Sequence, residues 1–152
     1  MKTNLKKIII IIILTILIGS FFSFFVSMDI YNVLKKPNLS PPSYVFPIAW
    51  IIIYIMISIS LYLVTNTKKN GNFDYYMIYV IQLIVNSLWT FIFFGLECFL
   101  FSFFWILLLI ILVLFMTYIY YQNNKYSAYL LIPYICWLIF AAYLNLQIYL
   151  LN

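Results

Sequence analysis

The stretch Lys36-Pro37-Asn38-Leu39-Ser40-Pro41-Pro42-Ser43-Tyr44-Val45-Phe46-Pro47 holds four of the chain's five prolines, and Trp50 follows it closely. Apolar segments long enough to cross a bilayer lie on both sides of it. Proline fixes φ and removes a backbone donor, so this stretch is predicted to be a stiff, non-helical connector. A simple membrane tether needs no rigid connector there, whereas a lid over a pocket does.

The composition is that of a membrane protein. The 152 residues are 68% hydrophobic and 7% charged, with a mean hydropathy of +1.13, whereas soluble proteins are roughly 45–50% apolar and about 25% charged. Long unbroken apolar runs favour helices over a barrel, whose strands would alternate in segments of about ten residues. We therefore expect an all-α integral membrane protein.

Five transmembrane helices are predicted in one bundle that covers residues 1–152, without a soluble domain or an internal repeat. Polar or very short connections separate the spans, so neighbouring spans are expected to run antiparallel. Pro133 is expected to kink the last of them. The predicted spans are about 8–27, 43–64, 73–94, 99–121 and 126–150.

The first span has a competing interpretation as a signal peptide, because Lys2, Lys6 and Lys7 precede its apolar core. Its run of about 20 residues has no clear small-x-small cleavage site, which favours a retained helix. The lysines also predict the orientation, since six of them fall on the N-terminal side of the membrane and only Lys35 and Lys36 on the other. The positive-inside rule then puts the N-terminus in the cytoplasm of a bacterial-type cell, with the connector and the C-terminus outside.

Several kinds of chemistry lack the residues they need. The chain has no histidine and only two cysteines, Cys98 and Cys136, so no metal site of the His/Cys type is expected. Asp29, Asp74 and Glu97 lie outside the span centres, so neither an acid–base pair nor an intramembrane proton relay is visible. The net charge of +5 comes from lysines at span ends, which orient a membrane protein and do not indicate nucleic-acid binding.

Three predicted spans carry a stripe that combines a tryptophan with small or polar residues. Residues spaced by three or four share one helix face. Helix-to-helix hydrogen bonding, at about 0.6 kcal/mol per amide, and interfacial aromatic belts are the plain alternatives to ligand contact. Aromatic walls with a few amides suit a planar, apolar ligand in a pocket between helices. The stripes are Phe46, Trp50, Tyr54 and Ser58; Gln82, Asn86, Trp89 and Phe93; and Pro133, Trp137, Ala141 and Asn145.

These residues and the connector occur together in an order that resembles the TspO/MBR family of tryptophan-rich sensory proteins and translocator (peripheral benzodiazepine receptor) proteins. The resemblance covers nearly the whole chain. The segments that carry it are Lys36-Pro37, Pro41-Pro42, Phe46-Pro47 with Trp50 and Tyr54, Gln82-Leu83 with Asn86 and Trp89, Phe93-Phe94-Gly95-Leu96, Ala128 to Tyr134, Trp137, Phe140-Ala141, Tyr143-Leu144-Asn145 and Leu151-Asn152.

The resemblance implies a five-helix bundle, often dimeric, whose pocket is roofed by the first loop and binds porphyrins; no cofactor beyond that ligand is implied. Some members of the family also bind cholesterol or benzodiazepine-type drugs. Light-dependent porphyrin degradation has been proposed for bacterial members, which by resemblance would involve Trp50 and Trp137. The pocket residues implied are Pro42, Phe46, Trp50, Tyr54, Asn86, Trp89, Phe93, Trp137 and Ala141.

The chain also departs from the family's pattern. Leu39 and Tyr44 stand where the family often has a loop tryptophan, and Trp105 stands where it commonly has an acid. Neither Tyr143 nor Tyr149 is followed by a basic residue, so the C-terminal cholesterol motif fails and cholesterol binding is not expected.

Four functions remain at this point. The first is a porphyrin-binding sensor, regulator or carrier, and the second is a light-dependent enzyme that degrades porphyrin. The third is a transporter of planar apolar ligands, which no inverted repeat supports. The fourth is a structural helper with an empty pocket.

Overall fold

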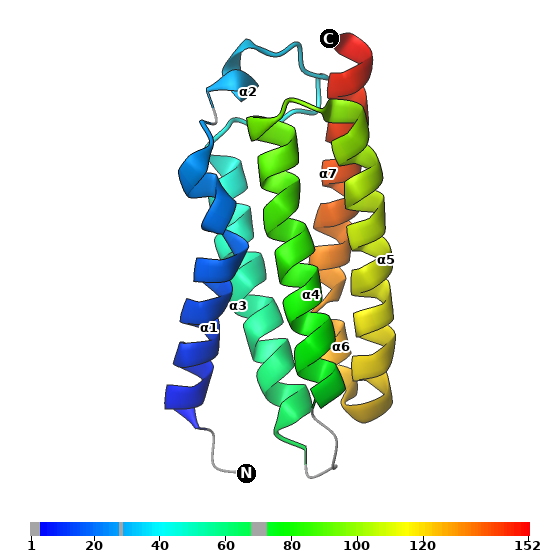
Figure 1. Ribbon diagram of the computed structural model, residues 1–152. Coiled ribbons are helices and arrows are strands. Elements are labelled where there is room, and N and C mark those ends of the chain that lie inside the picture. The colour runs from blue at the N-terminus through cyan, green and yellow to red at the C-terminus, as the bar shows by residue number, and fades with distance from the viewer. Residues whose placement is uncertain (1–3, 28, 68–72) are drawn as a thin grey trace.

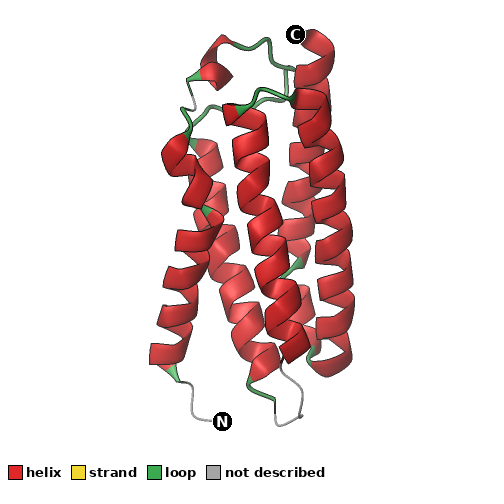
Figure 2. Cartoon of the chain, viewed as in Figure 1, coloured by secondary structure: helices red, strands yellow, loops and turns green. Residues whose placement is uncertain are grey.

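The computed structural model describes residues 4–27, 29–67 and 73–152, and within these ranges the regular structure is entirely helical (Figures 1 and 2). The predicted all-α fold is therefore confirmed. The elements are α1 (Leu5–Gly19), the 3₁₀ helix η1 (Phe21–Phe25), α2 (Ile30–Val33), α3 (Val45–Thr65), α4 (Phe73–Thr90), the π-helical η2 (Phe91–Gly95), α5 (Phe99–Asn123), α6 (Lys125–Tyr129) and α7 (Ile132–Leu151).

Four helical segments in the described residues are long and apolar enough to cross a membrane: 45–65, 74–95, 99–123 and 125–151. They match the second to fifth predicted spans within a few residues. The chain is thus a membrane protein with several apolar helices, as its composition requires.

The first predicted span differs from the expected continuous helix over residues 8–27. The α-helix ends at Gly19, which leaves α1 with 15 residues, and the chain continues as η1. Hydroxyl groups cause the change, since Ser20 Oγ donates to the Ile16 carbonyl at 2.5 Å and Ser23 Oγ to the Ser20 carbonyl at 2.5 Å. Such side-chain bonds compete with the regular backbone ladder, and Gly/Ser pairs are common kink sites.

The last predicted span is interrupted near Pro133, where a kink was expected. The helix breaks at Leu130 and Leu131, and Pro133 lies in the first turn of α7. A proline there removes an N–H that has no intrahelical partner anyway. The expected kink near Pro133 is therefore confirmed as a short break between α6 and α7.

The helices pack side by side into one bundle. α1 lies against α3 and α4, α5 lies against α4 and α7, and α3 also contacts α6. The N-terminus and the turn between α5 and α6 are at one end, while the first loop and the C-terminus are at the other (Figure 1).

The described lysines lie at both ends of the bundle. Lys6 and Lys7 belong to the first turn of α1 and Lys125 begins α6, at one end, whereas Lys35 and Lys36 lie in the first loop at the other end. Lys2, Lys68 and Lys69 lie outside the described residues.

The connector that separates α1 from α3 is mostly non-helical, as predicted. It contains the single-turn helix α2, then an irregular segment over residues 34–44, and α3 begins at Val45 with Pro47 in its first turn. The Val45 N–H donates to the Pro42 carbonyl at 3.0 Å, which starts the helix directly after the double proline. The rigid prolines therefore fix both the path of the loop and the start of α3.

Candidate functional site

The main cavity lies between α1 with η1, α3 and α4, and it has a volume of about 250 Å³. Its walls are mostly apolar and aromatic, and four hydroxyl-bearing side chains, including that of Tyr54, contribute to them. It is lined by Ile16, Gly19, Ser20, Ser23, Phe46, Pro47, Trp50, Ile51, Tyr54, Trp89, Thr90 and Phe94.

The α3 wall comes from one helix face. Phe46, Trp50 and Tyr54 repeat every four residues, which stacks their side chains along the helix. The rings of Trp50 and Tyr54 are stacked at 5.7 Å with an interplanar angle of 28°. Together these residues form a flat aromatic surface along the cavity.

Gly19 and Tyr54 form the floor of the cavity. A Cβ on Gly19 would lie 2.5 Å from Cζ and 2.7 Å from the hydroxyl oxygen of Tyr54, so only glycine permits this approach. One turn further from the loop, Ser58 Oγ donates to Thr15 Oγ1 at 2.9 Å, and Thr15 Oγ1 lies 2.6 Å from the Tyr79 hydroxyl. This hydrogen-bonded cluster joins α1, α3 and α4 beneath the cavity.

The α4 wall lies at the π-helical turn. The Leu96 N–H donates to the Phe91 carbonyl five residues back, at 3.0 Å, and such single turns are frequent at functional sites. Trp89 and Phe93 are stacked at 5.4 Å, and Phe93 meets Phe94 edge-on at 4.8 Å. Phe94 lines both the main cavity and a smaller one beside it, and Phe93 lines the smaller one.

The smaller cavity, of about 20 Å³, lies between Tyr31, the aromatic wall and α7. Its polar member is Asn145, whose Oδ1 accepts from Trp89 Nε1 at 3.1 Å and from Ser102 Oγ at 3.0 Å. Asn145 Nδ2 donates to the Phe99 carbonyl at 2.7 Å. One amide therefore joins α4, α5 and α7 and fixes the orientation of the Trp89 ring.

Two further amides of α4 face the bundle interior. Gln82 accepts a hydrogen bond from the Tyr134 hydroxyl at 3.0 Å, and Asn86 lies beside the Tyr54 phenol. Both residues are at most 1% exposed, and Gln82 Nε2 has no partner within the described residues. A buried donor without a partner costs free energy, and neither amide lines the main or the smaller cavity.

Tyr31 supports the first loop from below. It is only 4% exposed, its hydroxyl donates to the Pro41 carbonyl at 3.1 Å, and its ring lies edge-on to Phe46 at 5.0 Å. Burial raises the pKa of Tyr31, which keeps the phenol protonated as a donor. The Nζ of Lys36 lies 4.5 Å from the same ring.

A sequence model of the TspO/MBR family matches residues 8–151. The chain belongs to the TspO/MBR family. It is 34% identical over 152 residues to the tryptophan-rich protein TspO of Archaeoglobus fulgidus, covering 98% of this chain and 99% of that relative. It is 37% identical over 124 residues to the tryptophan-rich protein TspO of Chlorobaculum tepidum, covering 80% and 78%. A tryptophan-rich sensory protein of Cereibacter sphaeroides is 30% identical over 122 residues, covering 80% and 76%.

The family resemblance read from the sequence is thereby confirmed, and the structure shows where each predicted site residue lies. Phe46, Trp50, Tyr54 and Trp89 line the main cavity. Phe93 and Ala141 line the smaller cavity, together with Phe46 and Trp89.

The other three predicted residues line neither of these two cavities. Trp137 lies behind the aromatic wall, with its ring 6.0 Å from that of Phe46 and 6.4 Å from that of Trp50. Asn86 is buried beside Tyr54, and Pro42 is exposed in the loop. Trp137 and Asn86 therefore contact residues of the cavity wall without lining the cavity.

Sequence reasoning missed the contribution of the first span. Ile16, Gly19, Ser20 and Ser23 line the cavity, yet no tryptophan drew attention to that segment. The signal was present, because these four residues share one helical spacing and interrupt an otherwise apolar run with glycine and serine. Pro47, Ile51, Thr90 and Phe94 were the other omissions.

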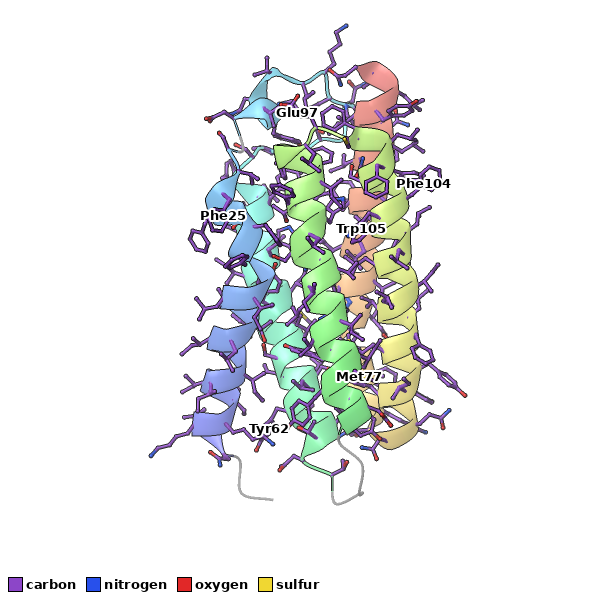
Figure 3. All side chains as sticks on the ribbon, in the orientation of Figure 1. Phe25, Tyr62, Met77, Glu97, Phe104 and Trp105 are labelled. Atoms are coloured by element: carbon purple, nitrogen blue, oxygen red, sulfur yellow. The ribbon has the colours of Figure 1, made fainter. Side chains whose placement is uncertain are left out.

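Trp105, which stands where the family commonly has an acid, faces away from the cavity. Its Nε1 donates to the Val85 carbonyl at 2.8 Å, so it joins α5 to α4. Its neighbour Phe104 points out of the bundle, as does Phe25 of η1 (Figure 3). Trp105 therefore contributes to helix packing and lines neither cavity.

Proposed function

We propose that this chain is a membrane tetrapyrrole-binding protein that acts as a sensor, regulator or carrier of its ligand. The observation that carries the proposal is the aromatic cavity between α1, α3 and α4, with Trp50, Tyr54 and Trp89 in its walls. Flat aromatic rings favour stacked or edge-on contact with another planar π-system. Membership of a family that includes tryptophan-rich sensory proteins supports the sensory role.

The size and polarity of the cavity suggest how such a ligand is held. Ligand pockets usually measure about 300–1,000 Å³, so a cavity of about 250 Å³ suits part of a macrocycle inserted edgewise. Ile51, at one margin, is 50% exposed, so the remainder of the ligand would face the apolar surroundings. The hydroxyls of Ser20, Ser23 and Thr90 offer polar contacts inside.

Tryptophan fluorescence tests the proposal, because Trp50 and Trp89 line the cavity whereas Trp105 and Trp137 do not. Purified protein in detergent micelles would be titrated with protoporphyrin IX in darkness, with tryptophan emission and porphyrin absorbance recorded. We expect saturable quenching and a Kd that rises about tenfold in Trp50→Phe, since a stacking surface is lost. Trp105→Phe is the matched control, which loses emission but keeps the Kd.

Two outcomes would contradict the proposal. Absence of saturable quenching at micromolar porphyrin would overturn the proposal. Equal effects of Trp50→Phe and Trp105→Phe on the Kd would show that porphyrin binds elsewhere on the protein.

A second function is favoured by the contact between Trp50 and Trp137, whose rings meet edge-on at 6.4 Å. Light-dependent porphyrin degradation would use Trp50 at the ligand and Trp137 behind it. The same titration under illumination separates this function from binding. Light-driven loss of porphyrin absorbance that disappears in Trp137→Phe, with the dark Kd unchanged, would support it, whereas stable absorbance would exclude it. Saturable binding combined with ligand flux in vesicles would instead indicate a transporter of planar apolar ligands.

We also propose that α1 and η1 together form a fifth span. They cover residues 5–25 and lie alongside α3 and α4 (Figure 1). With five spans in a bacterial cytoplasmic membrane, the lysine distribution puts the N-terminus in the cytoplasm and the loop and C-terminus outside. Labelling of single cysteines at Lys7 and Asn38 with a membrane-impermeant reagent tests this, in a background without Cys98 and Cys136. Labelling of the Lys7 site in intact cells would contradict it.

A further inference from the structure

Asn152 makes three hydrogen bonds where α7 ends. Its Oδ1 accepts from the Lys35 N–H at 3.0 Å, and its Nδ2 donates to the Lys35 carbonyl at 3.0 Å and to the Ile148 carbonyl at 2.8 Å. The side-chain amide thus pairs with both backbone groups of one residue, as a neighbouring strand would. We call this pairing the Asn152 clamp.

The clamp acts on the start of the first loop. Lys35 lies two residues after the end of α2 and just before the proline-rich segment. The loop crosses the end of the bundle at which α7 ends (Figure 1). Residues 35 and 152 are 117 positions apart in sequence. A pair so remote contributes nothing to local helix or turn formation, so its effect is to hold the loop against α7.

A chain of contacts leads from the clamp to the cavity. Lys36, next to the clamped residue, places its Nζ over the Tyr31 ring, and the Tyr31 hydroxyl bonds the Pro41 carbonyl on the far side of the loop. The Tyr31 ring packs on Phe46, which lines both cavities. The loop is therefore held at Lys35 and at Pro41, and only the second attachment contacts the cavity wall.

We propose that Asn152 is a positioning residue that keeps the first loop closed over the ligand cavity and thereby sets the rate at which ligand enters and leaves. The ligand in this inference is the one of the proposed function. The existence of the clamp does not depend on that proposal. Lys35 and Asn152 are exposed, so water competes for their hydrogen bonds and the loop can open without unfolding the bundle.

The kinetic signature follows from where Asn152 lies. Asn152 lines neither cavity, so it stabilises the closed loop to the same extent in the ligand-free and the ligand-bound protein. Equal stabilisation of these two states leaves the ligand affinity unchanged. Breaking the clamp should therefore raise the association and dissociation rates together. Loss of a direct ligand contact would instead raise the Kd.

The first measurement needs no ligand. Hydrogen–deuterium exchange of residues 29–46 would be compared among three forms of the whole chain. These are the unchanged protein and the variants Asn152→Ala and Asn152→Asp. We expect about tenfold faster exchange around Lys35 in Asn152→Ala, because two hydrogen bonds to that residue are lost. Asn152→Asp keeps the acceptor for the Lys35 N–H and should fall between the two. Asn38→Ala, which removes an exposed amide from the same loop, is the control and should change nothing.

The second measurement uses stopped-flow quenching by protoporphyrin IX in darkness. Asn152→Ala should bind and release porphyrin about tenfold faster, with a Kd within twofold of the unchanged protein.

Each contrary outcome is distinct. Faster exchange confined to residues 146–151 would show that Asn152 only caps α7 through Ile148, and would overturn the clamp. Faster loop exchange without faster kinetics would overturn control of the site. If the unchanged protein does not bind porphyrin, the proposed function and the ligand part of this inference fail, while the exchange experiment still decides the clamp.

Discussion

The buried side-chain hydrogen bonds between helices differ between the two halves of the bundle. In the half near the first loop, amides bond aromatic side chains, as Asn145 does with Trp89 and Gln82 with Tyr134. In the opposite half, small hydroxyls bond one another across close helices. Ser60 Oγ donates to the Ser127 carbonyl at 2.8 Å, and Ser127 Oγ donates to the Ser60 carbonyl at 2.6 Å.

The difference accounts for the position of the cavity. Small residues let backbones approach closely, so the helices around Ser60 and Ser127 leave side chains such as Val64 and Met116 with 0% exposure. In the half near the first loop, the rings of Trp50, Tyr54 and Trp89 line the space between α1, α3 and α4. The space that their rings do not fill is the main cavity, and the hydroxyl cluster of Thr15, Ser58 and Tyr79 marks the boundary between the two halves.

The largest expected effect comes from removing the amide that anchors the aromatic half. Asn145→Ala leaves Trp89 Nε1 and the Phe99 carbonyl without their Asn145 partner in a buried site, and each such group costs about 1–3 kcal/mol. We expect a loss of about 4 kcal/mol in the free energy of unfolding in mixed micelles. Gln147→Ala on the same helix is the control. A loss no larger than that of the control would mean that this amide does not hold the half together.

Overfilling the close-packed half should have the next largest effect. Ser60→Leu puts a large side chain between α3 and α6 and breaks the paired serine bonds. We expect about 3 kcal/mol of destabilisation by the same unfolding assay, with the porphyrin affinity of the folded fraction unchanged. Ser43→Leu, at an exposed loop position, should cost little. A changed affinity would show that the two halves are not independent.

The third prediction concerns the contact between Gly19 and Tyr54 at the floor of the cavity. Gly19→Ala puts a methyl group against the Tyr54 ring, which must shift toward the cavity. We expect about 2 kcal/mol of destabilisation and about a tenfold rise in the Kd for porphyrin.

The double variant Gly19→Ala with Tyr54→Leu identifies the cause. It should recover most of the lost stability because the clash is removed, and a double-mutant cycle measures that coupling. Additive effects of the two changes would contradict a direct Gly19–Tyr54 contact.

The smallest effect is expected for Trp89→Phe. It removes the indole N–H, but Asn145 Oδ1 still accepts from Ser102, so the loss should be about 1 kcal/mol. Trp105→Phe, which removes the bond to the Val85 carbonyl, provides the comparison outside the cavity. A cost for Trp89→Phe that matched Asn145→Ala would mean that the indole N–H, and not the amide, is the critical group.

Much of the architecture could be predicted from periodicity and length. Residue spacing placed Phe46, Trp50 and Tyr54 on one face of α3, and the structure puts all three on the cavity. Spacing also put Trp137 on a stripe with Ala141, and the family resemblance implied it as a pocket residue, yet its ring lies behind Phe46 and Trp50. A stripe states which side chains share a face, but it does not state which of two facing helices stands nearer to the cavity.

The sequence by itself determined that this is a helical membrane protein of the TspO/MBR family, because composition, span length and the order of prolines, amides and tryptophans are properties of the chain. Tertiary structure decided the rest. The close approach of Tyr54 to Gly19 and the pairing of Asn152 with Lys35 both join residues remote in sequence. Local rules do not contain such contacts, because they exist only once the helices have packed.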